Sequence, residues 1–278
     1  MYLGSHLPQY GRVAAPDAIT RAARHAESLG FSDVWVSDHV VHPASQSYPS
    51  PYLYDPLLTL TWAAAATSGI GLGTSVLVIP QHNPLWLANA LASLDALSGG
   101  RLTIAVGVGW SEAEFDALGQ SFHDRGKRTD EIVKLLRTCW RDDPASFHGE
   151  FYRFDDMRVL PQPAHTIPIW IGGSSERAYR RGVELGDGFQ LIGVTPAEAR
   201  GPIERLRSER PEAEFRVSLR TGWDPLGMEH DIIRREYDEF QAAGVQHAIS
   251  APWRADLDEW LRSMEILAGL TDRATPSA

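Results

Sequence analysis

Cysteine is almost absent from this chain, which has one, Cys139, among 278 residues. A single thiol excludes an intramolecular disulfide framework and a zinc site built from several thiolates. It suits a reducing compartment, so we expect a cytoplasmic protein. Cys139 falls on the apolar face of a helix predicted over residues 124–141, which favours a buried, inert thiol over a nucleophile.

Long hydrophobic runs are missing as well. No apolar run reaches the ~20 residues that a membrane-spanning helix needs, and the N-terminal residues show no signal-peptide pattern. Positive charge is in deficit, because 26 Lys and Arg against 36 Asp and Glu give a formal net charge of −10. We therefore expect neither nucleic acid nor a membrane as the main partner.

The rest of the composition, 43% hydrophobic and 22% charged, is that of an ordinary globular protein. Short β-rich runs alternate with helix-length amphipathic stretches. We predict strands at residues 2–7, 33–37, 71–78, 102–106, 168–171, 188–192, 215–221 and 245–250, each followed by a helix. Several strands are continuously apolar, which is typical of parallel sheets covered by helices. Eight such units predict the α/β class and a single (β/α)8 TIM barrel.

The fourth and fifth predicted strands start at residues 102 and 168, which leaves room for an insertion at about 111–166. It contains the helix of residues 124–141 and an aromatic alternation around His148-Gly149 that predicts a β-hairpin. We expect this insertion on the barrel rim, over the mouth, by which we mean the C-terminal ends of the strands. The barrel would span residues 1–270, and residues 271–278 would form a frayed tail.

Functional groups of such barrels cluster just past the C-terminal ends of the strands. The second strand ends in Asp38-His39, where a carboxylate beside an imidazole could tune a proton donor. A solvated loop pair or a capping aspartate is the alternative. His39 and His42 have ligand-like spacing, but without a nearby third ligand we predict no metal site.

The fourth strand ends in glycines, Gly107 and Gly109, followed by Trp110 and Glu112. Glycines let a ligand approach the backbone, and Trp110 could form an apolar wall. A dinucleotide-binding loop would need glycine where Glu112 stands, so we discard it. Glu112 is either a site carboxylate or a first-turn charge of the next helix.

The fifth strand ends in Gly172-Gly173-Ser174-Ser175 and runs directly into a helix. Backbone N–H groups at such a helix start form an anion site, most naturally for phosphate. An ordinary turn with a serine cap is the alternative. The basic run at residues 125–128 is either solvated surface or faces an anionic cofactor tail.

Together these segments resemble the luciferase-like monooxygenase superfamily, in particular its oxidoreductases that use coenzyme F420. The resemblance extends over most of residues 1–192. It is carried by four motifs in order: Ser37-Asp38-His39, Thr74-Ser75-Val76-Leu77, Gly107-Val108-Gly109-Trp110 with Glu112, and Ile171-Gly172-Gly173-Ser174.

The resemblance implies a cofactor across the barrel mouth. Asp38 would hydrogen-bond the deazaflavin, His39 would lie near its reactive carbon, and Glu112 would share proton transfer with His39. A bulged third strand with a non-proline cis peptide against the ring would fall at Ser75–Val76. The other cofactor-binding residues would be Gly107, Gly109, Trp110, Gly172, Gly173 and Ser174.

We therefore expect a coenzyme F420-dependent oxidoreductase that transfers a hydride between the deazaflavin and a small organic substrate. The protein would orient two planar reactants and manage one proton. One alternative is an FMN-dependent monooxygenase on the same fold. A second is a non-catalytic flavin-binding barrel, which would need neither His39 nor Glu112. By resemblance we also expect a homodimer.

Overall fold

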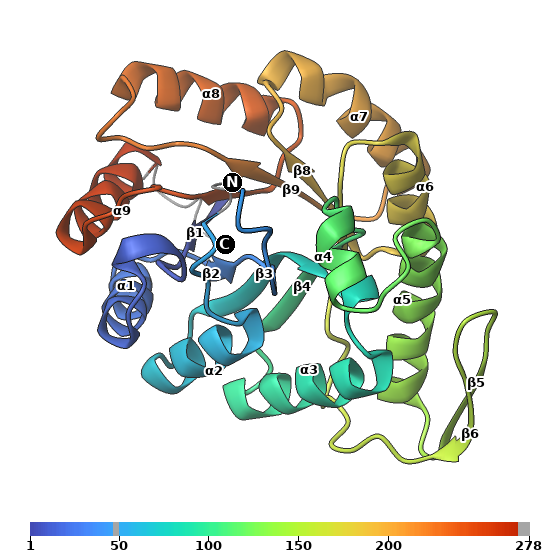
Figure 1. The fold of residues 1–278 in the computed structure, drawn as a ribbon. Coiled ribbons are helices and arrows are strands. Elements are labelled where there is room, and N and C mark those ends of the chain that lie inside the picture. The colour runs from blue at the N-terminus through green and yellow to red at the C-terminus, as the bar shows by residue number, and fades with distance from the viewer. Residues whose placement is uncertain (47–49, 272–278) are drawn as a thin grey trace.

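The structure, a computed structural model, describes residues 1–46 and 50–271. In these residues eight parallel strands close a barrel, as predicted (Figure 1). Around the barrel the strands follow the order β1 (Tyr2–His6), β10 (His247–Ser250), β9 (Arg216–Thr221), β8 (Gly188–Ile192), β7 (Ile169–Gly172), β4 (Leu102–Gly107), β3 (Gly71–Val78) and β2 (Asp33–Val36).

An outer layer of helices covers this barrel (Figure 1). Its members are α1 (Pro16–Ser28), α2 (Pro56–Ala66), α3 (Pro84–Ser98), α5 (Arg125–Arg141), α6 (Glu176–Leu185), α7 (Pro196–Glu209), α8 (His230–Ala242) and α9 (Leu257–Thr271), with short 3-10 turns at Gly11–Val13 and Ile79–Gln81. Thr271 thus ends a helix, and residues 272–278 of the predicted tail lie outside the described residues.

Helix boundaries follow local signals in the sequence. The side chain of Asn83 caps α3 by accepting hydrogen bonds from the N–H groups of Leu85 and Trp86, and Pro84 occupies the first turn. At the other end Gly99 has φ +73°, the left-handed conformation that glycine adopts most easily. Such capping sets where α3 begins and ends.

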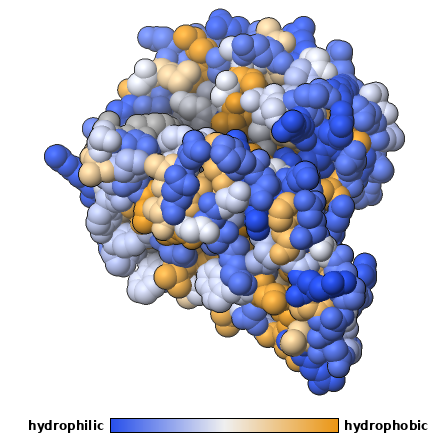
Figure 2. Space-filling model, turned by 45° about the vertical axis from the view of Figure 1, so that its right-hand side comes forward, coloured by the Kyte–Doolittle hydropathy of each residue, from blue (hydrophilic) through white to orange (hydrophobic). Residues whose placement is uncertain are grey.

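The insertion contains the short helix α4 (Glu112–Ala117), α5, and the predicted hairpin, formed by β5 (Ala145–His148) and β6 (Arg153–Met157). The expectation that it covers the mouth is wrong for the hairpin. The carboxylate of Glu131, midway along α5, accepts hydrogen bonds from the N–H groups of residues 150, 151 and 152, which holds the hairpin turn against α5. The hairpin therefore projects from the side of the barrel (Figures 1 and 2).

Two tryptophans fill the lower part of the barrel interior. The rings of Trp35 and Trp170 stack with centroids 5.4 Å apart. Three glycines on neighbouring strands leave the space for them, since a Cβ at Gly4 or Gly73 would overlap Trp35 and one at Gly188 would overlap Trp170. This aromatic layer closes the barrel below the mouth.

Cys139 is buried in the core, as predicted. Burial, with a smaller contribution from the charge of Asp142, raises the pKa of its thiol to about 11, so the reactive thiolate is scarce at neutral pH. Among the described residues no helix has the length and apolarity to cross a membrane. The cytoplasmic location stays a prediction.

The fit between Gly73 and Trp35 predicts a large effect of one added methyl group. Gly73→Ala should lower the free energy of unfolding by about 2 kcal/mol or more, because the buried indole cannot move aside. Gly201→Ala, in open space on α7, is the matched control and should raise it by about 0.5–1 kcal/mol. Urea unfolding measures both, and equal midpoints for Gly73→Ala and the wild type would contradict this packing.

Candidate functional site

The structure brings most of the predicted site residues to one arc of the barrel rim. Strands β2, β3, β4 and β7 are neighbours around the barrel, and the predicted residues lie at or just past their C-terminal ends. They are Asp38, His39, Ser75, Val76, Gly107, Gly109, Trp110, Gly172, Gly173 and Ser174.

Strand β3 has the irregularity that the resemblance implied. The Ser75–Val76 peptide bond is cis, and the register of β3 with β4 shifts between Thr74 and Leu77. The Val76 side chain then projects between two glycines: a Cβ at Gly107 would lie 2.5 Å, and one at Gly172 2.6 Å, from a methyl carbon of Val76. These glycines thus make room for an apolar ledge, by which we mean the Val76 side chain between them.

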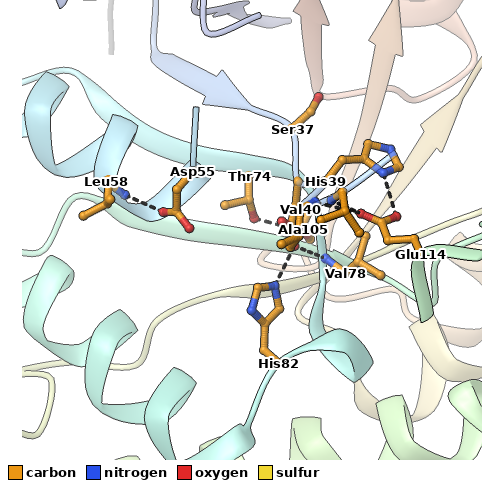
Figure 3. Close-up of polar contacts among 12 residues, drawn as sticks. Ser37, His39, Val40, Asp55, Leu58, Thr74, Val78, His82, Ala105 and Glu114 are labelled. Atoms are coloured by element: carbon orange, nitrogen blue, oxygen red, sulfur yellow. Dashed lines mark hydrogen bonds and ion pairs between the residues drawn. The ribbon is translucent and has the colours of Figure 1, made fainter. Parts of the chain in front are cut away.

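Asp38 ties the strand after this bulge to the end of β2. Its Oδ2 atom accepts a hydrogen bond from the N–H of Val78 at 2.8 Å and lies 2.8 Å from Nε2 of His82 (Figure 3). The other oxygen, Oδ1, is buried and has no hydrogen-bond partner in the described part of the chain. One carboxylate oxygen is thus committed to the fold, and the other is buried without a hydrogen-bond partner among the described residues.

His39 is held by a carboxylate that the sequence analysis did not select. Its Nδ1 lies 3.0 Å from Oε2 of Glu114, whose Oε1 accepts hydrogen bonds from the N–H groups of Val40 at 2.7 Å and Val41 at 3.3 Å (Figure 3). A carboxylate can only accept, so Nδ1 carries the proton. Among the described residues the hydrogen bond of His39 is made through Nδ1, and Nε2 has no hydrogen-bond partner.

Glu114 is nearly fully buried, with 1% of its side chain exposed. Burial alone would raise the pKa of its carboxyl group, but hydrogen bonds from His39, the Val40 N–H and Gln81 outweigh burial and lower the pKa to about 2. Glu114 is therefore a carboxylate at neutral pH. It can orient the His39 ring through the hydrogen bond at Nδ1.

The pairing of His39 with Glu112 that we expected from the sequence is wrong. The Glu112 side chain is 57% exposed and lies 3.9 Å from the exposed His123. Successive residues of a helix are rotated by about 100°, so Glu112 and Glu114 point to opposite sides of α4. Ser111 caps this helix, and a Ser-x-x-Glu pattern ordinarily folds its glutamate back onto the cap. Here Glu114 reaches across to the end of β2 instead.

Trp110 flanks the imidazole on its solvent side. The rings of Trp110 and His39 meet edge to face with centroids 5.7 Å apart, and Trp110 is 57% exposed. An exposed indole at this position can cover a ligand that reaches His39.

The predicted anion corner is built from the end of β7 and the start of α6. Ser175 caps the helix by accepting a hydrogen bond from the N–H of Ala178, which leaves the hydroxyl of Ser174 uncommitted to the cap. Gly173 has φ +141°, a conformation that other residues rarely adopt. The N–H groups of Glu176 and Arg177, which precede Ala178 in the first turn of α6, remain as donors for an anion.

The basic run at residues 125–128 is engaged within the protein. Arg125 Nε donates to the carbonyl oxygen of Gly109 at 3.1 Å, Arg128 pairs with Asp124, and Lys127 lies 3.4 Å from Glu150. Arg125 thus steadies the loop that carries Trp110. Its partners favour a structural role over the cofactor-tail role that the sequence left open.

Sequence reasoning also missed an inward-facing polar layer that lies on top of the tryptophans. Side chains alternate along a strand, so the residues two positions beyond Gly4, Trp35, Gly73, Gly188 and Ser218 also face inward, one step nearer the mouth. We call this layer the polar floor; it consists of His6, Ser37, Ser75, Gln190 and Arg220. Polar residues inside apolar strands are the signal that could have revealed it.

The link between Asp38 and His82 predicts a measurable titration. Burial tends to lower the pKa of His82, but the hydrogen bond and the charge of Asp38 outweigh it, so the pKa is raised. Asp38→Asn should therefore lower the pKa of His82, as measured by NMR of its imidazole. Glu112→Gln, which removes an exposed carboxylate from α4, is the control and should leave it unchanged.

The same link has a defined pH dependence. A raised pKa in the folded state contributes stability below the ordinary value near 6.5, and this contribution is lost as the pH rises through the raised value. The stability advantage of the wild type over Asp38→Asn should thus shrink with rising pH through that window. An advantage that grows instead would contradict the assignment.

Comparison with known proteins gives a family match and several relatives. The sequence model of the family "Luciferase-like monooxygenase" matches residues 2–222. The uncharacterized protein Rv0940c of Mycobacterium tuberculosis is 33% identical over 205 residues, which cover 69% of this chain and 70% of that protein. The F420-dependent glucose-6-phosphate dehydrogenase of Kineococcus radiotolerans is 32% identical over 179 residues, which cover 63% of this chain and 52% of that protein.

Among solved structures, the monooxygenase RslO1 from Streptomyces bottropensis superposes with a TM-score of 0.83 at 21% identity, over 98% of each chain. An F420-dependent secondary alcohol dehydrogenase in complex with an F420-acetone adduct superposes with a TM-score of 0.81 at 19% identity, over 98% of this chain and 99% of that one. At these identities the likeness establishes the shared barrel fold.

Proposed function

Because this chain belongs to the luciferase-like monooxygenase family, we propose that it is a coenzyme F420-dependent oxidoreductase acting on a small organic substrate. Two relatives that are 30–32% identical to this chain are named F420-dependent glucose-6-phosphate dehydrogenase. The alignment with this chain covers about half of the length of each of them. The observation that carries the proposal is the apolar ledge of Val76 on the same rim as a carboxylate-held imidazole, His39.

The residues present fit a deazaflavin. A flat ring needs an apolar surface to lie on, and the ledge of Val76 between Gly107 and Gly172 supplies one without neighbouring side chains in the way. The buried, unpartnered Oδ1 of Asp38 would accept a hydrogen bond from the ring system. The N–H and the hydroxyl of Ser174, which follows the turn at Gly173, would hold the phosphate of the cofactor. The N–H of Gly173 itself donates to the carbonyl oxygen of Gln190.

When bound, the deazaflavin supplies or takes up a hydride, and the protein manages the accompanying proton. His39 would hold or release that proton at Nε2, because Nδ1–H is donated to Glu114. The Glu114 carboxylate keeps the ring oriented. Trp110 would limit water around the imidazole. In this proposal Glu114 is the carboxylate beside His39, a role that we had expected for Glu112.

A fluorescence titration of the purified protein with F420 and, separately, with FMN tests the cofactor. We expect saturable binding of F420 and much weaker binding of FMN. Gly173→Asp should weaken F420 binding by about tenfold or more relative to Gly173→Asn, because only the aspartate repels the phosphate. The two variants share the same backbone strain, so their difference isolates charge. Tight FMN binding without F420 binding would support an FMN-dependent enzyme instead.

His39→Ala separates binding from catalysis in the same assay. Its F420 affinity should stay within about tenfold of the wild type while turnover with F420 falls by about 10² or more. Equal loss of both would make His39 a binding residue. A wild-type protein that binds F420 but turns over no substrate in a broad screen would favour the non-catalytic flavin-binding alternative.

We also propose that the protein is a homodimer that packs through α2. This helix has no charged side chain, and apart from Thr59 and Thr61 it is apolar, which is typical of helices buried on every side. Yet Leu58 is 73% and Trp62 54% exposed in the single chain, and Trp86 on the adjacent α3 is exposed as well. A second copy of the chain that covers this face would bury these exposed apolar side chains.

Sedimentation velocity at micromolar concentration tests the dimer. The wild type should sediment as a dimer, and Leu58→Glu should shift it toward monomer because a charge would be buried at the interface. Met157→Glu places the same charge on an exposed apolar residue of the hairpin and should leave the dimer intact. A monomeric wild type would refute this assignment.

A further inference from the structure

The polar floor contains two side chains that are fully buried and lack protein partners at hydrogen-bonding atoms. Among the described residues, the two ring nitrogens of His6 have no hydrogen-bond partner. The Nε2 atom of Gln190 has none either. The hydroxyl of Ser75 donates to Oε1 of Gln190 at 2.7 Å, which directs the unsatisfied NH2 group away from Ser75. Buried polar groups in folded proteins are ordinarily satisfied, so these atoms point to a bound polar group.

The floor offers donors in an electropositive setting. Burial, with a smaller contribution from the positive charge of Arg220, lowers the pKa of His6, so its ring is neutral with one N–H donor. Arg220 itself donates to the carbonyl oxygen of Ser75 at 2.6 Å. The described part of the floor contains no carboxylate. Such a surface suits an oxygen atom that carries partial negative charge.

An aromatic wall stands beside His6 on the side of the barrel away from the ledge. The ring of Trp253 lies nearly parallel to His6 with centroids 6.4 Å apart, and the guanidinium of Arg220 lies 5.5 Å from the Trp253 ring centre. These residues belong to β1, β9 and the loop after β10, whereas the ledge belongs to β3, β4 and β7. A planar cofactor on the ledge would leave this wall to face the substrate.

We propose that His6 and Gln190 bind the oxygen of a carbonyl substrate, a ketone or aldehyde, beside the wall formed by Trp253. This inference rests on the proposed function for its redox partner. The carbonyl carbon gains a hydride, its oxygen gains a proton from His39 Nε2, and an alcohol forms; the reduced deazaflavin is the co-reactant that loses the hydride. As the hydride arrives, negative charge grows on the oxygen that the two donors hold.

The same residues argue against a sugar phosphate as substrate. A phosphate dianion calls for several cationic or N–H donors. In the polar floor the guanidinium of Arg220 is the single cationic group, and it is engaged with the Ser75 carbonyl and the Trp253 ring. A neutral carbonyl oxygen needs no more than the donors that His6 and Gln190 provide.

The test uses two probes, cyclohexanone and glucose 6-phosphate, titrated into protein saturated with oxidised F420. Both cyclohexanone and the cofactor are then oxidised, so no reaction occurs. The ¹⁵N signals of the His6 imidazole should shift on addition of cyclohexanone and stay in place with glucose 6-phosphate. His6→Phe and Gln190→Leu should each weaken cyclohexanone binding by at least about tenfold. His165→Phe, far from the mouth, should not.

Melting temperatures and F420 affinities of the variants distinguish a specific loss of ketone binding from a loss of fold or of cofactor binding. His6→Phe should melt at or above the wild-type temperature, because it removes buried polar atoms that lack protein partners. Gln190→Leu also removes the acceptor of the buried Ser75 hydroxyl and should melt below the wild type. Unchanged cyclohexanone binding in both variants, or a loss of F420 affinity in place of ketone affinity, would overturn the proposal. If the wild type binds no F420, the proposed function fails, and the same titrations on the protein alone still decide the role of His6.

Discussion

The arrangement of the mouth depends on one carboxylate, that of Asp38. By accepting from the N–H of Val78 and pairing with His82, it fixes the segment that follows the β3 bulge. That segment sets where Val76 projects, and two glycines on β4 and β7 give it room. Because the residue after Asp38 is His39, the clamp also places the imidazole at a set distance from the ledge. Stability and chemistry are thus coupled through neighbouring residues of one loop.

Inside the barrel, a lower layer of side chains serves packing, and the layer above it is suited to binding a ligand. The lower layer is filled by Trp35 and Trp170, which stack because glycines replace side chains opposite them. The polar floor lies above, where buried donors would be costly if they served packing alone, at about 1–3 kcal/mol for each unsatisfied group. Such a cost is commonly accepted at functional sites. The sharp change from indoles to unpartnered polar groups therefore marks where a ligand is expected to begin.

Much of this could be predicted from the sequence, for identifiable reasons. The eight alternating strand and helix units and the continuously apolar strands predicted the barrel. The residues just past the C-terminal ends of the strands were predicted to lie together at the mouth. The bulge at Ser75–Val76 came from resemblance alone, because local propensity does not encode a cis peptide. Glu114 was missed since its partner lies 75 positions earlier in the chain. The position of the hairpin depends on Glu131, another long-range contact that periodicity does not report.

The most direct test of the central claim is a crystal structure of the protein with oxidised F420 bound. We predict the tricyclic ring against the Val76 side chain, with the phosphate at the N–H groups around Gly173 and the His39 imidazole facing the ring. A ring bound on the outer surface, or on the Trp253 side of the barrel with the ledge left bare, would contradict it.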